Sequence, residues 1–167
     1  MEYGNQELTI RALRTDDGVR LVKMDEVASG RRRQTWIEGR LNRALAESDI
    51  QVSLGAEADG TLIGAIMGTV QFGEFGQAEP TAILDTVLVD AEFGRKGVAS
   101  AMLGQLLENL AGLRIGRLRT QLAWDELDLM AFFGKSGFQP APRLVLELDV
   151  EEGLRLARRR EESLAEG

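Results

Sequence analysis

The sequence contains no cysteine and no histidine among its 167 residues. Without cysteine, the chain forms no disulfide, no thiolate metal site and no cysteine nucleophile. Without histidine, it lacks the most common zinc ligand and the most common general base. We therefore predict no metal site, and any catalysis must use carboxylates, hydroxyl groups, lysine, water or the backbone.

Long apolar runs and an excess of basic residues are also missing. No uninterrupted apolar segment approaches the roughly 20 residues that cross a membrane. The N-terminal residues 1–5 have neither a basic start nor an apolar signal core. We therefore expect a cytoplasmic protein with no membrane partner. The formal net charge of −7 argues against a broad nucleic-acid surface and makes cationic or amine-bearing ligands electrostatically easier to bind.

The composition is that of a globular domain, with 44% hydrophobic and 28% charged residues. The order of the predicted elements indicates an α/β fold with a mixed sheet, because hairpin strands come first and a strand-helix-strand crossover follows. We assign this domain to residues 1–150. Residues 151–167 are charged and poor in large apolar side chains, which predicts a short helix or a frayed tail.

Local patterns predict the individual elements. Strands are expected at residues 8–13, 50–57, 61–70, 83–89, 118–122 and 143–150, and helices after residue 17 and at residues 36–46, 98–111 and around 130–136. The Asp59-Gly60 pair between two apolar runs predicts a hairpin. Phe72–Pro80 is rich in glycine and predicts a loop, whose two aromatic residues either cover a ligand or anchor the loop itself.

The most informative segment is a strand that leads through a basic loop into a helix. The apolar strand Ile83–Val89 is followed by a loop that contains Gly94 and Gly97. The first amides of the next helix have no intrahelical partner, so they can donate to phosphate oxygens, and Arg95 and Lys96 add positive charge. The same pattern also fits an ordinary turn with solvated basic residues. Neither a Walker lysine nor the three glycines of a dinucleotide loop are present, so another phosphate-bearing ligand is favoured.

This segment resembles the signature of the GNAT superfamily of N-acetyltransferases. In that family, a strand that ends in valine precedes Gln/Arg-x-x-Gly-x-Gly/Ala, which binds the pyrophosphate of acetyl-CoA. Gly97 and Ala99 occupy the last two signature positions, whereas Gly94 stands at the first and Arg95 follows it. A second match lies later in the chain, where Met130–Phe138 resembles the family's helix with the pattern Leu-Tyr-x-x-x-Gly-Phe.

The resemblance covers about residues 8–150 and implies a single GNAT-like domain with a mixed, mostly antiparallel central sheet flanked by helices. It implies that acetyl-CoA is the cofactor and that its acetyl group passes by direct attack to a primary amine of a small molecule or a protein. The implied cofactor-binding residues are Val87, Val89, Gly94, Arg95, Lys96, Gly97, Val98, Ala99, Ser100, Glu126 and Phe133. Backbone amides of the central strand polarise the thioester carbonyl in this family, and we assign that catalytic role to the segment centred on Leu88.

Asp85 is the predicted general base. It lies in an otherwise apolar strand, where an ionisable side chain is costly unless it is paired or functional. Many members of the resembled family place a carboxylate at this position, where it contacts the amine or holds a relay water. The alternative is that Asp85 begins the strand and accepts a hydrogen bond from a loop amide.

The proton donor for the leaving thiolate is not evident from the sequence. Phe133 stands where the family usually has a tyrosine, and it has no proton to donate. The only tyrosine, Tyr3, lies in the N-terminal tail. Three accounts remain open: protonation by water, protonation by Ser136 or Thr120, or binding of acyl-CoA without efficient transfer.

Two segments are candidates for acceptor selection. Arg31–Trp36 occupies the helix connection that forms one wall of the acceptor site in the resembled family, although charge clusters of this kind are usually a solvated helix entrance. The position of a CoA-contacting asparagine falls among Asp125, Glu126 and Asp128, carboxylates that also suit a helix cap or a cationic acceptor.

Two other function classes compete with the transferase. One is a non-catalytic acyl-CoA-binding regulatory module, which the absence of the tyrosine favours. The other is a structural or partner-binding domain, for which Arg158–Arg160 is the first candidate contact. A homodimer is possible because the last strands of such folds offer free edges.

Overall fold

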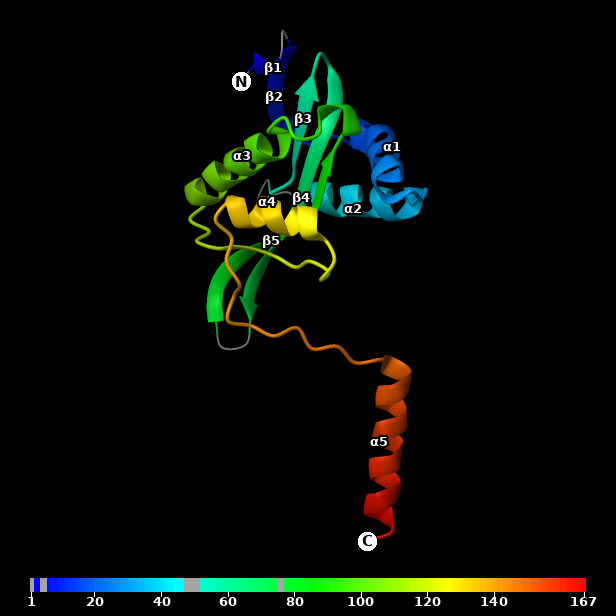
Figure 1. Ribbon diagram of the computed structural model, residues 1–167. Coiled ribbons are helices and arrows are strands. Elements are labelled where there is room, and N and C mark those ends of the chain that lie inside the picture. Colours follow the sequence, from blue (N-terminus) through cyan, green and yellow to red (C-terminus); the bar gives the residue numbers. More distant parts are fainter. Residues whose placement is uncertain (1, 4–5, 47–51, 75–76) are drawn as a thin grey trace. The chain divides into compact units, whose positions relative to one another are not determined.

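The computed structural model describes residues 1–167 except residues 1, 4–5, 47–51 and 75–76 (Figure 1). The chain divides into two compact units, Met1–Met130 and Ala131–Gly167. Among the described residues, no helix combines the length and the apolar character needed to cross a membrane.

The first unit is built on a six-stranded sheet whose strands follow one another in chain order. The strands are β1 (Glu2–Tyr3), β2 (Gln6–Ala12), β3 (Leu54–Ala58), β4 (Thr61–Glu74), β5 (Gln77–Val89) and β6 (Leu118–Thr120). All neighbours pair antiparallel except β5 and β6, which pair parallel. The predicted mixed, mostly antiparallel sheet is confirmed.

Helices cover both faces of this sheet (Figure 1). The helices of the first unit are the short 3-10 helices η1 (Thr15–Asp17) and η2 (Ala91–Phe93) and the α-helices α1 (Gly18–Ser29), α2 (Gln34–Ala46) and α3 (Val98–Gly112). α1 and α2 lie on one face, where Leu21 and Ile37 are fully buried, and α3 lies on the other, where Met102 is fully buried. Each such side chain contributes about 1.5–3 kcal/mol by leaving water.

The predicted hairpin is confirmed. Ala58 of β3 pairs with Thr61 of β4, which leaves Asp59 and Gly60 as a two-residue turn. Both turn residues have positive φ, 48° and 74°, as a type I′ turn requires. The start of the strand predicted at residues 50–57 lies partly outside the described residues, and β3 itself begins at Leu54.

The loop predicted at Phe72–Pro80 is wrong for the residues that the structure describes there. β4 continues to Glu74 and β5 begins at Gln77, with Phe72 opposite Pro80 and Glu74 opposite Gln77. Gly73, with φ 84°, lies where the register shifts. Pairing between β4 and β5 therefore overrides the turn preference of the glycines, because a β-bulge at Gly73 accommodates the residue that does not pair.

The last predicted strand, at residues 143–150, is also wrong. Among the described residues, this segment pairs with no strand, and Leu144 and Leu146 are almost fully exposed. Alternating apolar residues favour a strand only where a neighbouring strand supplies the hydrogen bonds.

The second unit contains the end of α4 (Leu127–Lys135) and the helix α5 (Val150–Ala165). The side chain of Asp149 caps α5 by accepting a hydrogen bond of 3.0 Å from the amide of Glu152. The C-terminal residues thus form a 16-residue helix rather than a short or frayed one.

A buried ion-pair network ties the N-terminal strand to the start of α1. The guanidinium of Arg11 donates two hydrogen bonds of 2.8 and 2.9 Å to Asp17 and one of 2.6 Å to Glu57. Asp17 is 6% exposed and also accepts from the amide of Arg14 at 2.7 Å. Burial raises the pKa of Asp17, but the hydrogen bonds from Arg11 and Arg14 outweigh it, so the pKa lies below its ordinary value of 3.8.

We predict that Asp17→Asn lowers the free energy of unfolding at pH 7 by about 3 kcal/mol, because the substitution leaves the Arg11 charge buried without its main partner. The folded-state pKa of Asp17 is depressed, so its stabilisation is present above pH 3.8 and is lost as pH falls through the folded-state pKa. Urea unfolding at pH 7 and pH 3 should therefore give a smaller deficit at pH 3. The exposed neighbour Asp16, changed to Asn, is the control. Equal deficits for Asp17→Asn at the two pH values would contradict this account.

Candidate active site

The central strand β5 carries a bulge at Asp85. Met67 of β4 pairs with Thr86 and the next residue, Gly68, pairs with Leu84, so Asp85 is the extra residue. The backbones approach closely here, since a Cβ on Gly68 would lie 2.5 Å from the carbonyl oxygen of Ile83. The close approach explains why glycine occupies this position beside the bulge.

One edge of β5 is open beyond the bulge. β6 pairs only with residues Ala82–Leu84, and in the part of the chain that the structure describes no strand pairs with that edge of residues 85–89. The amide of Asp90, directly after β5, donates to the carbonyl of Ile63 in β4 at 2.7 Å. Because amides alternate along a strand, Leu88 also faces β4, whereas Val87 and Val89 face the open edge.

A loop with free amide donors continues from this edge. The side chain of Asp90 caps η2, and the loop then passes through Arg95 (φ 58°) and Gly97 (φ 83°) into α3. The first amides of α3, at Val98, Ala99 and Ser100, have no partner within the helix by its geometry. The loop and the helix N-terminus that were predicted to bind an anion thus lie next to one another.

The basic side chains of the loop lie at the surface. Arg95 and Lys96 are exposed, and the Lys96 Nζ lies 5.5 Å from the centroid of the Phe93 ring. Both cations therefore stand beside the N-terminus of α3, where the helix dipole also favours an anion.

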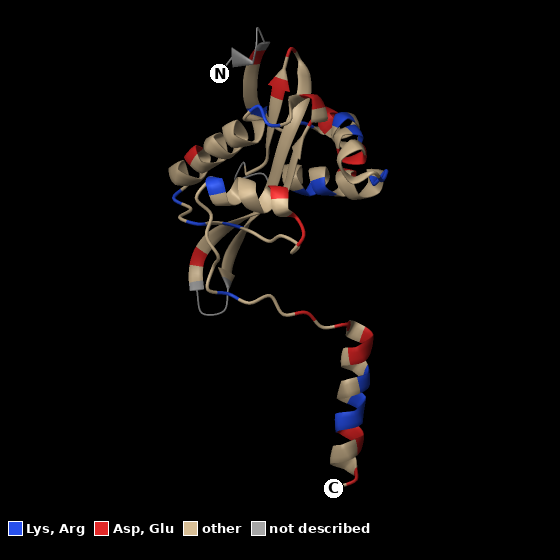
Figure 2. Ribbon diagram, in the orientation of Figure 1, with Lys and Arg blue, Asp and Glu red and all other residues tan. Residues whose placement is uncertain are grey.

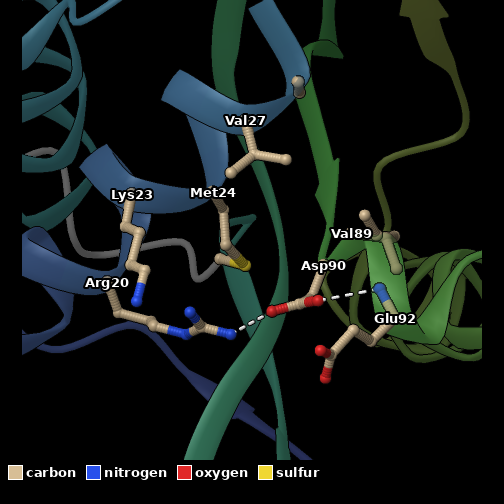
Figure 3. Close-up of a pocket in the computed structure, with 9 residues that line it drawn as sticks. Arg20, Lys23, Met24, Val27, Val89, Asp90 and Glu92 are labelled. Carbon is tan, nitrogen blue, oxygen red and sulfur yellow. Dashed lines mark hydrogen bonds and ion pairs between the residues drawn. The ribbon is translucent and has the colours of Figure 1, made fainter.

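A cavity of about 450 Å³ lies between α1 and the end of β5 (Figure 3). Its wall on the α1 side is formed by Arg20, Lys23, Met24, Val27 and Ala28, and its other wall by Val89, Asp90, Ala91 and Glu92. Arg20 and Asp90 form an ion pair across it, and the Glu92 amide donates to Asp90 at 2.9 Å. The cavity thus reaches both the last residue of the open strand edge and the start of the loop.

Asp85 is paired with an arginine of α2. The Arg40 Nη1 lies 2.7 Å from Asp85 Oδ1, and the hydroxyl of Thr86 donates to the same oxygen at 2.8 Å. The side chains of Arg40 and Asp85 are 27% and 29% exposed. Asp85 therefore takes part in an ion pair between the sheet and α2, rather than in the loop hydrogen bond that was its alternative role.

Arg40 was not among the sequence-predicted site residues. Its guanidinium lies 4.6 Å from the centroid of the Trp36 ring, and that of Arg33 lies 4.2 Å from it. Arg33 in turn donates two hydrogen bonds of 2.5 and 3.0 Å to the buried Asp25. These hydrogen bonds are the main reason why the pKa of Arg33 is raised. The signal for Arg40 was its position four residues after Trp36, one helical turn along the same face.

The other predicted residues have local partners. The hydroxyl of Thr120 donates to the Leu84 carbonyl at 2.8 Å, where β5 and β6 part. Glu126 accepts from the amide of Ala123 at 3.0 Å, in the turn that precedes α4. Tyr3 lies in β1, opposite Gln6, and so belongs to a strand and not to an irregular tail.

Two predicted residues lie on α4 or directly after it. Phe133 is 4% exposed, and its ring contacts that of Phe138 at a centroid distance of 4.9 Å. The hydroxyl of Ser136 donates to the carbonyl of Phe132 at 2.8 Å. Phe133 thus has the packing of a core residue. The hydroxyl proton of Ser136 is engaged in a hydrogen bond to the last turn of α4.

Comparison with known proteins identifies the family. The model of the acetyltransferase (GNAT) family matches residues 19–138, more than half of the chain. The chain belongs to the GNAT acetyltransferase family. The match includes the strand, loop and helix at residues 83–100 and the second motif at residues 130–138, so the resemblance is confirmed for both segments. No curated protein sequence matches the chain.

Solved structures share this GNAT fold at low sequence identity. The aminoglycoside N-acetyltransferase AAC(6')-Iy in complex with CoA has a TM-score of 0.71 at 13% identity, over 89% of this chain and 99% of that chain. A transcriptional regulator from Bacillus halodurans has a TM-score of 0.69 at 17% identity, over 86% and 99%. The ribosomal-protein-alanine N-acetyltransferase from Brucella melitensis has a TM-score of 0.67 at 16% identity, over 86% and 99%.

We predict that Gly97→Ala lowers the free energy of unfolding by about 1 kcal/mol, because a side chain in the left-handed region is strained. Gly94→Ala is the matched control, since Gly94 has an ordinary φ of −62° and a Cβ added there would meet only a carbonyl oxygen at 3.4 Å. Urea unfolding of both variants measures the difference. If the two substitutions cost the same, backbone strain at Gly97 is not the cause.

Proposed function

We propose that this GNAT protein transfers the acetyl group of acetyl-CoA to a primary amine by direct attack. The observation that carries the proposal is the open edge of β5 running directly into the amide donors at the start of α3. An open strand edge suits an extended amide-bearing chain, and a helix N-terminus suits a phosphate. Acetyl-CoA combines both in that order, and CoA is the ligand named for the similar AAC(6')-Iy.

The donor's pyrophosphate is assigned to the loop. The amides of Gly97, Val98, Ala99 and Ser100 would donate to its oxygens, and Arg95 and Lys96 would add positive charge. The departure from the family signature at Gly94 removes one side chain and no backbone donor. The loop therefore retains the groups on which the site depends.

The pantetheine arm is assigned to the open edge of β5. Val87 and Val89 would exchange hydrogen bonds with its amides as an added strand does. The Val87 amide also suits the developing oxyanion, because it faces the open edge two residues after the bulge. Leu88 lies at the centre of this segment, but its own amide faces β4 by alternation, so we transfer the carbonyl-polarising role from Leu88 to its neighbour.

The chemical step exchanges one bond for another at the thioester carbon. The amine nitrogen forms a bond to this carbon, the bond from carbon to sulfur breaks, and the sulfur keeps the electron pair. The products are an N-acetyl amine and CoA, with one proton lost from nitrogen and one gained by sulfur. The chain therefore has to accept the first proton and allow the second to be supplied.

Asp85 is proposed to accept the proton from nitrogen, directly or through a water. Its side chain is partly exposed at the bulge, next to the open edge. An incoming ammonium group would compete with Arg40 for the carboxylate, because both are cations. An amine that arrives as ammonium would first lose one proton to solvent, and Asp85 would accept the proton that nitrogen loses on attack.

Water is proposed to protonate the sulfur. Phe133 has no proton to give, and the hydroxyls of Thr120 and Ser136 already donate to backbone carbonyls. An alkyl thiol has a pKa near 8.5, so a thiolate released at neutral pH takes a proton from solvent without a dedicated acid. The reaction therefore proceeds without the family's usual tyrosine.

A non-catalytic acyl-CoA-binding module is the second candidate. Two observations favour it: Phe133 at the tyrosine position and the existing pairing of Asp85 with Arg40. Such a module binds acetyl-CoA but acetylates no amine. Turnover with amines separates the two candidates.

We predict that calorimetry detects saturable binding of acetyl-CoA and of CoA, and that Gly97→Glu weakens both by about 100-fold or more. The new carboxylate repels the pyrophosphate, and its side chain occupies the space that the phosphate oxygens need.

The matched control is Gly104→Glu, which adds the same side chain on the exposed side of α3, where a Cβ has nothing within 4 Å. Normal binding by this variant would assign the loss to the loop. Folded wild-type protein that binds neither compound would overturn both candidate functions.

We predict that Asp85→Asn lowers kcat by about 100- to 10,000-fold and leaves the affinity for acetyl-CoA within a factor of about two, as for loss of a general base. Steady-state acetylation of an amine panel measures kcat, and calorimetry measures the affinity. Asp59→Asn in the β3–β4 turn is the control, because asparagine tolerates the positive φ of 48° found there. Undiminished turnover by Asp85→Asn would remove Asp85 from the mechanism.

A further inference from the structure

The helix α2 that carries Arg40, together with the segment before it, is rich in arginine for an acidic chain. Among the residues 31–43 are five arginines, whereas the whole sequence has a net charge of −7 (Figure 2). Arg33 is neutralised by the buried Asp25, and Arg32 lies 3.8 Å from Glu26. Arg40 and Arg43 remain beside the bulge, where both line a small hollow with Asp85.

This hollow beside the ion pair is small. Its volume is about 10 Å³, and its other lining residues are Ala44, Met67, Gly68 and Thr69. That is room for about one water molecule. Arg40 and Thr86 both contact Oδ1 of Asp85, so an acceptor whose amine takes this oxygen must separate Arg40 from Asp85.

Separation leaves Arg40 in need of a new anion. Its Nε is buried and has no hydrogen-bond partner among the described residues, and its guanidinium stacks on Trp36. A plain amine would take Asp85 and leave this partly buried cation uncompensated, which is costly. An acceptor that brings its own carboxylate would satisfy both charges at once.

We propose that the acceptor is an α-amino acid, bound with its amino group at Asp85 and its carboxylate at Arg40 and Arg43. This inference rests on the proposed acetyl transfer. The two protein charges lie 2.7 Å apart in the structure, so the groups that replace them on the ligand must be close neighbours. The amine and the carboxylate of an α-amino acid are attached to the same carbon. The Arg40–Asp85 ion pair thus lies where the two charges of a bound zwitterionic amino acid would lie.

Trp36 adds a surface for the acceptor's side chain. It lies on α2 one turn before Arg40 and is 42% exposed although two guanidinium groups flank it. An aromatic or large apolar side chain packs favourably against an indole ring. Aromatic and branched amino acids are therefore the first acceptors to test.

The test compares amino acids with the amines that lack only the carboxylate. The pairs are L-phenylalanine with 2-phenylethylamine and L-leucine with isopentylamine. For each compound, calorimetry measures binding to the full chain in the presence of CoA, and a thiol-release assay with acetyl-CoA measures kcat/KM. We expect wild type to favour the amino acid of each pair by about 10- to 100-fold in both measurements, the value of one charge-assisted contact.

Variants at Arg40 test whether this residue causes the preference for amino acids over the matching amines. Arg40→Gln should abolish it, chiefly by raising KM for the amino acid, and Arg40→Lys should restore part of it. Arg158→Gln, which removes one exposed arginine from α5, should leave it unchanged. Circular dichroism and urea unfolding establish that each variant is folded.

The outcomes separate this inference from the proposed function. Selective binding of amino acids without thiol release would support the carboxylate-binding subsite at Arg40 and Arg43 and reject the transferase. Acetylation of both members of each pair with equal efficiency would support the transferase and overturn the amino-acid inference. A preference that survives in folded Arg40→Gln would overturn the role of Arg40.

Discussion

The bulge at Asp85 is the constraint on which the site depends. β5 is held by β4 along its length, but the extra residue shifts the alternation of its amides, and β6 pairs only with the three residues Ala82–Leu84. Beyond that point Val87 and Val89 turn their backbone groups to an open edge. The same irregularity directs Asp85 toward α2 and leaves the strand to continue straight into the loop before α3.

The charges around this strand are arranged in two opposite ways. At the loop, Arg95 and Lys96 are exposed and the first amides of α3 have no helical acceptor, so the local field favours a phosphate. At the bulge, by contrast, Asp85 already pairs with Arg40, and both line a small hollow. Within the described ranges, no ion pair has to be broken before an anion binds at the loop, whereas the proposed acceptor site would require the Arg40–Asp85 pair to separate.

Much of the fold followed from local patterns in the sequence. The Asp59-Gly60 turn, the buried strand before residue 90 and the helices at α2 and α3 each have a signal that is complete within a few residues. The errors came where pairing between distant residues decided the outcome. Phe72 and Pro80 pair across two strands that were expected to form a loop, and the alternating leucines after Arg143 have no strand beside them in the described residues.

The sequence by itself determined the family, the order of strand, loop and helix at residues 83–100, and the absence of histidine, cysteine and a suitably placed tyrosine from the chemistry. These are properties of residue identity and short spacing. Only the tertiary structure decided which amides of residues 87–89 face outward, since one bulge reverses the alternation. It alone paired Asp85 with Arg40, 45 residues apart in the sequence, because the packing of α2 against the sheet brings their side chains together.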